Sequence, residues 1–117
     1  MRAITLLLLV ALAAGCSRTV AVGSGQVLHM ALTEYRLTPD RVRVPAGELT
    51  IVVRNLGKLT HNLALSRNNQ TQVQTKPIPP GSRAQLTVIL TPGTYVLDSS
   101  LFSDQALGLY GTLIVTG

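Results

Sequence analysis

Apolar and polar residues alternate along most of the chain from Gln26 to the C-terminus. In the stretch 84–90, for example, Leu86, Val88 and Leu90 share one parity. Alternation with a period of two residues is typical of β-strands that turn one face toward a core. The pattern predicts strands, in chain order, at 26–34, 42–44, 48–55, 61–66, 84–90, 95–99 and 110–116.

Glycine and proline separate these apolar runs. Pro45-Ala46-Gly47, the stretch 77–83 (PIPPGSR) and Thr91-Pro92-Gly93 have the composition of turns. No helical periodicity follows the first 25 residues, and 117 residues provide for one domain. We therefore expect an all-β Greek-key β-sandwich of about seven to eight strands. Tyr95, just after a turn, resembles the tyrosine corner of such sandwiches. The polar stretch 67–76 is expected to be a surface excursion.

The N-terminal sequence MRAITLLLLVALAAGC has the pattern of a bacterial export signal. Arg2 precedes an apolar run, Ile4–Ala14, that is too short for a permanent membrane-spanning helix. Cys16 follows Ala13-Ala14-Gly15 and resembles the acylated cysteine of a lipobox. We expect a cleaved signal peptide at 1–15, lipidated Cys16 with a tether at 16–25, and one domain at 26–117.

Composition narrows the classes of partner. The chain has ten Lys and Arg, five Asp and Glu, and a formal net charge of +5, but its basic residues are scattered and few aromatics accompany them. Nucleic-acid binding needs a clustered basic footprint, so no nucleic-acid partner is expected. The expected partner is a membrane, reached through the lipid on Cys16. The location would be the periplasmic side of the outer membrane in a diderm, or the outer face of the plasma membrane in a monoderm.

Two blocks of sequence resemble the cupredoxins, the small blue-copper proteins. In the C-terminal block, Gly93-Thr94-Tyr95 and Gly108-x-x-Gly111-Thr112-Leu113-x-Val115 fit the family's last two strands. In the N-terminal block, Pro45-Ala46-Gly47, Asn55-x-Gly57 and His61-Asn62 fit the family pattern. The resemblance implies a cupredoxin-like fold over nearly all of 26–117.

The positions that match the family's copper ligands are largely replaced. The resemblance implies histidine, cysteine, histidine and methionine at positions where this chain has His61, Ser99, Asp104 and Leu109. A type 1 copper site needs two imidazoles and a thiolate with a weak axial thioether. The only cysteine, Cys16, directly follows the export signal and is the expected site of lipidation. No cofactor is therefore expected, with copper as the alternative.

Three roles for His61 are open at this point. Strand parity turns it inward with Leu63 and Leu65, so it can be a buried imidazole held by hydrogen bonds. It can also bind Cu(II) or Zn(II) together with Asp104. Ser99, His61 and Asp104 are further the residue types of a hydrolytic triad, but a triad is recognised by geometry, and no catalysis is expected. His29 is expected on the surface, because adjacent Met30 has the opposite parity.

The loop 100–109 keeps an apolar character around the replaced ligand positions. Phe102 and Leu107 are expected to contact a partner there, since the resemblance implies that redox partners dock at this tip. We expect a lipid-anchored, non-enzymatic binding or accessory module of the cell envelope whose partner is another envelope protein. The alternative is an atypical copper- or zinc-binding protein that uses His61 for metal handling or electron transfer.

Overall fold

The computed structural model describes residues 19–23 and 25–117. The predicted signal peptide and Cys16 lie outside the described residues. Within the described part of the chain, no helix is long and apolar enough to cross a membrane.

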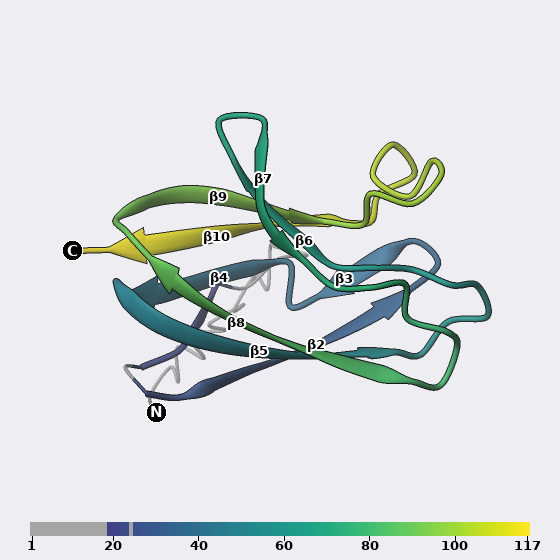
Figure 1. Cartoon of the computed structure of the whole chain (residues 1–117), viewed down its shortest axis with the longest axis horizontal. Coiled ribbons are helices and arrows are strands. Elements are labelled where there is room, and N and C mark those ends of the chain that lie inside the picture. The colour runs from purple at the N-terminus through teal and green to yellow at the C-terminus, as the bar shows by residue number, and fades with distance from the viewer. Residues whose placement is uncertain (1–18, 24) are drawn as a thin grey trace, which may run out of the picture.

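The described residues form ten strands in two sheets that face each other (Figure 1). The strands are β1 (Val20–Ala21), β2 (Val27–Thr33), β3 (Arg36–Thr38), β4 (Arg41–Pro45), β5 (Gly47–Asn55), β6 (Ala64–Arg67), β7 (Gln70–Gln74), β8 (Arg83–Leu90), β9 (Gly93–Asp98) and β10 (Tyr110–Thr116). One sheet has the order β1-β4-β10-β9-β6-β7, and the other has the order β3-β2-β5-β8. The expected all-β sandwich is confirmed, and the short strands β1, β3 and β7 raise the number of strands above the seven or eight expected.

The core lies between the two sheets, where the period-two alternation predicted it. Leu49, Ile51 and Val53 of β5 are buried, and Leu113 and Val115 of β10 are buried in the opposite layer. Each fully buried side chain of this size contributes about 1.5–3 kcal/mol through removal of apolar surface from water. The two inward faces therefore hold the sheets together and fix the register of their strands.

The edge strand β1 of the six-stranded sheet lies within 16–25, the segment predicted as a tether. Val20 and Ala21 pair in parallel with Val42 and Arg43 of β4, and Val22 is buried to 9% exposure. Backbone pairing at a sheet edge needs no side-chain periodicity. The folded part of the chain therefore begins before Gln26.

The polar stretch 67–76 is a surface excursion, as the sequence predicts, but most of it has strand conformation, which its lack of periodicity did not predict. The strands β6 and β7 form a hairpin that projects from the sandwich (Figure 1). Asn68 and Asn69 form its turn with φ of 53° and 62°, a left-handed conformation that asparagine tolerates. The exposed edge strand β7 shows no inward-outward alternation, so the sequence pattern did not reveal it.

The predicted tyrosine corner is confirmed. The Tyr95 side chain is 4% exposed, and its hydroxyl donates to the Thr91 carbonyl at 3.0 Å and accepts from the Thr91 amide at 3.2 Å. Arg67 also donates to this hydroxyl through Nη1 at 3.1 Å. These bonds fix the turn before β9, the strand that leads to Ser99.

Candidate functional site at the domain tip

Three segments that are distant in the sequence meet at one end of the sandwich. They are the β2–β3 turn with Glu34 and Tyr35, the segment 56–61 after β5, and the loop 100–109 between β9 and β10 (Figure 1). His61 forms an isolated antiparallel bridge with Ile78, and the strand predicted from 61 begins only at Ala64. The two backbone hydrogen bonds of this bridge fix the position of His61.

The His61 side chain is fully buried between two carboxylates. Its Nδ1 lies 2.7 Å from Oδ2 of Asp104, and its Nε2 lies 3.1 Å from Oε1 of Glu34. A ring nitrogen that donates its hydrogen to a carboxylate has no in-plane lone pair left for a metal. Among the roles considered for His61, the geometry agrees with a buried imidazole held by hydrogen bonds.

Asp104 is the centre of the network. Its Oδ2 accepts a hydrogen bond from Ser99 Oγ at 2.6 Å in addition to facing His61. Ser99 Oγ in turn accepts from the Asn62 amide at 3.3 Å. Ser99 is 1% exposed and Asp104 is 4% exposed, so both are shielded from bulk water. A network of this kind is stable in a low-dielectric interior only because its polar groups satisfy one another.

Leu109, the fourth position that matches a family ligand, is fully buried beside this network. Its amide donates to the Asp104 carbonyl at 2.9 Å, and its carbonyl accepts from the Ser99 amide at 3.3 Å. The structure thus brings together all four positions that the resemblance singled out. His29, in contrast, is exposed on β2, as strand parity predicts.

Glu34 is the member of the site that sequence reasoning missed. Its Oε1 accepts from the amides of Lys58 at 2.7 Å and Leu59 at 2.6 Å, and it also faces His61. The hydrogen bond from the Leu59 amide, with further ones from His61 and Lys58, holds the pKa of the Glu34 carboxyl below its ordinary value despite partial desolvation. No motif marks Glu34 in the sequence; the only hint is Gly57, where a Cβ would lie 2.5 Å from the Glu34 carboxylate oxygens.

Two buried asparagines hold the loops around the network. Asn55 donates through Nδ2 to the carbonyls of Leu59 at 2.7 Å and Ile78 at 2.8 Å, and its Oδ1 accepts from the Gly57 amide at 2.9 Å. Asn62 Oδ1 accepts from the Ser100 amide at 2.8 Å. These contacts give a physical reason for the Asn55-x-Gly57 and His61-Asn62 motifs.

The residues at this site do not fit a type 1 copper centre. Ser99 offers a hydroxyl in place of a thiolate, Leu109 offers no donor atom, and both nitrogens of His61 face carboxylates. The described residues contain no group of three or more His, Cys, Asp or Glu side chains that could hold a metal ion. Within the same part of the chain, every buried side-chain nitrogen or oxygen has a hydrogen-bond partner, so no orphaned donor points at a missing ion.

The connectivity also differs from that of a hydrolytic triad. In a triad the serine hydroxyl bonds to the imidazole, and the carboxylate bonds to the other ring nitrogen. Here Ser99 donates to Asp104 at 2.6 Å, and the carboxylate stands between the hydroxyl and His61. The imidazole is therefore not placed to take the proton of Ser99.

An apolar surface lies above the buried network. We call Tyr35, Leu59, Phe102 and Leu107 the tip surface; Phe102 is 97% exposed, and the others are between 37% and 55% exposed. They line a pocket of about 440 Å³ together with Thr60, Ser103 and Asp104. Phe102 and Leu107, the predicted contact residues, are thus displayed to solvent on one side of the tip.

Comparisons with known proteins agree with this architecture. No curated protein matches the chain. Reduced auracyanin from Roseiflexus castenholzii aligns with 20% identity and a TM-score of 0.66 over 88% of this chain and 100% of its own. Auracyanin B aligns with 16% identity and a TM-score of 0.72 over 80% and 90%, and rusticyanin from Thiobacillus ferrooxidans with 17% identity and 0.69 over 84% and 82%. At these identities the likeness shows the fold alone.

The family assignment comes from the sequence. The model of the cupredoxin-like domain matches residues 5–115, which is nearly the whole chain. The two-sheet sandwich and the tip at which the four matched positions meet are in keeping with that match. The chain belongs to the cupredoxin-like domain family.

Proposed function

We propose that this protein is an exported, lipid-anchored module of the cell envelope that binds another envelope protein through its tip surface and neither catalyses a reaction nor carries electrons through copper. The main support for the proposal is that the ring nitrogens of His61 already have hydrogen-bonding partners in the protein. Both nitrogens of His61 face carboxylates, directly beneath an exposed apolar surface.

The chemistry of the site supports a role without copper. Fast electron transfer at a type 1 centre depends on a thiolate ligand, and Ser99 does not supply one at neutral pH. A metal that used His61 would first have to displace Asp104 or Glu34 from a ring nitrogen. That competition also counts against the metal-handling alternative.

The tip surface supports a role in binding. Phe102 has a φ of 52°, which is uncommon for a bulky side chain and places backbone strain at this position. Its ring is nonetheless 97% exposed, so packing within the domain does not explain the strain. A displayed apolar cluster beside polar loop residues is a common feature of protein-binding surfaces.

The anchoring part of the proposal rests on the N-terminal sequence. Arg2, the apolar run Ile4–Ala14 and Cys16 provide the three parts of a lipoprotein signal. Mass spectrometry of the protein isolated from membranes tests this part. A diacylated peptide that begins at Cys16 supports it, and an unmodified Cys16 contradicts it.

The absence of copper from the working protein is tested by titration with Cu(II), Cu(I) and Zn(II), followed by calorimetry and visible absorption. We expect no binding that depends on His61. Sub-micromolar binding that is lost in His61→Ala would instead establish metal handling, and Asp104 would then be the next residue to test.

The binding role is tested by crosslinking in membranes of the source cells. We expect the double variant Phe102→Ala, Leu107→Ala to lose a crosslinked partner that the wild type retains. Ile89→Ala is a matched control, because Ile89 is 77% exposed on β8, away from the tip surface. A partner captured equally by all three proteins would contradict the proposal.

A further inference from the structure

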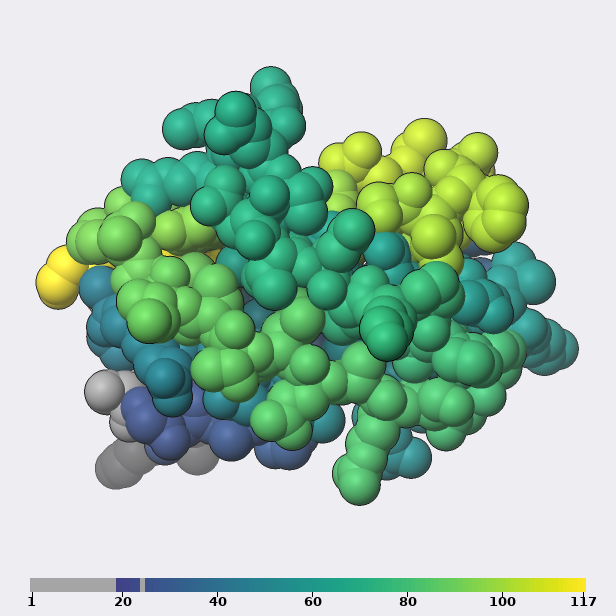
Figure 2. All heavy atoms as spheres, in the orientation of Figure 1, coloured from purple at the N-terminus to yellow at the C-terminus, as the bar shows by residue number. Residues whose placement is uncertain are grey.

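A second pocket lies on the outer face of the six-stranded sheet, apart from the tip surface. It has a volume of about 310 Å³, at the small end of the roughly 300–1,000 Å³ typical of ligand sites. Its lining comes from β9, from the β6–β7 hairpin and from the loop before β10: Ser66, Arg67, Asn68, Asn69, Thr94, Val96, Asp98 and Gln105. In the space-filling view the hairpin and the loop project from the same side of the molecule with a notch between them (Figure 2).

Strand parity explains how this lining assembles. Thr94, Val96 and Asp98 alternate with the buried Tyr95 and Leu97, so they point outward from β9. Val96 pairs with Ser66 of β6. The hairpin then turns at its two left-handed asparagines and closes one side of the pocket.

Asp98 is the acidic group of this pocket. The side chain is half-buried, and the structure gives it no hydrogen bond or ion pair with any residue in the described ranges. Burial raises the pKa of the Asp98 carboxyl above its ordinary value of 3.8. A partly desolvated carboxylate without a partner is unfavourable, and a bound cation with N–H donors would remove that cost.

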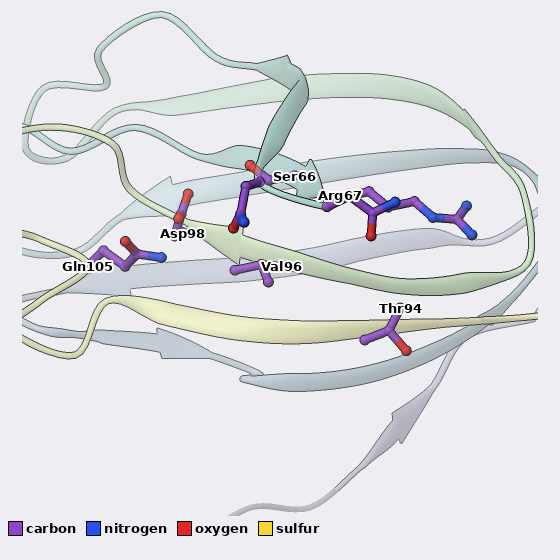
Figure 3. A pocket seen from close by; sticks show the side chains of 8 residues that line it. Ser66, Arg67, Thr94, Val96, Asp98 and Gln105 are labelled. Carbon is purple, nitrogen blue, oxygen red and sulfur yellow. The ribbon is translucent and has the colours of Figure 1, made fainter.

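The one basic residue in the lining is directed elsewhere. Arg67 Nη1 donates to Thr91 Oγ1 at 2.8 Å and to the Tyr95 hydroxyl, and Nη2 donates to the Pro92 carbonyl at 2.8 Å. In the close view its side chain extends toward the Thr94 end, away from Asp98 and Gln105 (Figure 3). Arg67 is therefore held by the tyrosine corner and leaves Asp98 without a counter-ion.

The surroundings of Asp98 suit an organic cation. Gln105 lies at the same end of the pocket and supplies an amide oxygen (Figure 3). Val96 offers apolar contact at 39% exposure.

We propose that this pocket binds a small organic cation with a primary ammonium group, whose N–H donors reach Asp98 and Gln105 and whose carbon chain lies against Val96. The proposal is independent of the role of the tip surface. Because the whole chain carries a net charge of +5, general attraction of cations to the protein does not account for such binding. The site must act through short-range contacts.

The test is a titration of the purified protein with n-butylammonium and putrescine at neutral pH, followed by amide NMR shifts. We expect saturable changes in the amide shifts of residues 66–69, 96–98 and 105 with the amines. Uncharged 1-butanol should not change the shifts of these residues. Asp98→Asn should weaken binding by about tenfold or more, the usual consequence of losing one charged hydrogen bond. Glu48→Gln removes an equal charge at an exposed position on β5 and should leave binding unchanged.

Three results would overturn the proposal. One is the absence of saturable shifts with both amines. The second is equal affinity of the wild type and Asp98→Asn. The third is the same pattern of shifts with 1-butanol; this comparison uses the unaltered protein, so it decides the question even when Asp98→Asn does not fold.

Discussion

Nδ1 of His61 and Oδ2 of Asp104 are 2.7 Å apart, and both side chains are buried. The same oxygen receives the hydroxyl hydrogen of Ser99 at 2.6 Å. His61 and Ser99, two of the positions that match copper ligands, thus both contact the same oxygen of Asp104. An internal hydrogen-bond network therefore joins three of the four positions that the sequence resemblance matches to copper ligands.

Removal of the central carboxylate should destabilise the fold. Asp104→Ala leaves one nitrogen of His61 buried without a partner, which costs about 1–3 kcal/mol. The Ser99 hydroxyl loses its shortest hydrogen bond but keeps Asn62 Oδ1 as an acceptor at 3.1 Å, so this loss costs about 0.5–1.5 kcal/mol. We expect the free energy of unfolding to fall by about 2–4 kcal/mol in urea denaturation. Asp40→Ala, at an exposed position, should change it by about 0.5 kcal/mol or less. Similar stability of both variants would show that the network contributes little.

Gly57 and Glu34 should be energetically coupled. A Cβ at residue 57 would lie 2.5 Å from the Glu34 carboxylate, so Gly57→Ala must displace Glu34 from Lys58, Leu59 and His61. We expect Gly57→Ala to cost about 1–3 kcal/mol in the wild-type background, mostly through these lost hydrogen bonds.

The same substitution should cost much less in Glu34→Ala, because the clash and the hydrogen bonds are then both absent. A double-mutant cycle measures the difference. Additive effects of the two substitutions would contradict the proposed contact.

Acid should weaken the fold through Glu34. The pKa of this carboxyl is lowered in the folded state, chiefly by the hydrogen bond from the Leu59 amide, from an ordinary value of 4.5. A group with a depressed folded pKa contributes stability above its unfolded pKa and loses it as the pH falls through the folded value. The stability difference between wild type and Glu34→Gln should therefore shrink from pH 7 toward about pH 3 in urea denaturation. A difference that does not change with pH would exclude this source of stability.

The fold should accept a copper centre when the ligands are supplied. We predict that the triple variant Ser99→Cys, Asp104→His, Leu109→Met binds Cu(II) and gains strong visible absorption, because His61 is already oriented by Glu34. The same triple variant with His61→Ala is the control and should stay colourless. A folded triple variant without copper-dependent absorption would show that the loops no longer have the required geometry.

The sequence by itself determined which side chains face the core. Parity along the predicted strands predicted the buried positions of β5 and β10 and, in the stretch 61–66, the inward His61. Tyr95 and the motifs around Asn55 and Gly108 predicted the corner and the cupredoxin-like frame. The buried faces follow from local periodicity, which each segment shows by itself, and the frame follows from the resemblance of short motifs to the family pattern.

Only the tertiary structure decided which polar groups pair. Glu34 lies 27 residues from His61, and Asp104 lies 43 residues from it, so neither partnership leaves a local pattern. Residue types suggested a triad, but the order of the hydrogen bonds placed Asp104 between Ser99 and His61. The hairpin strand β7 and the edge strand β1 were missed for a related reason: their strand conformation comes from backbone pairing with distant segments and not from alternating side chains.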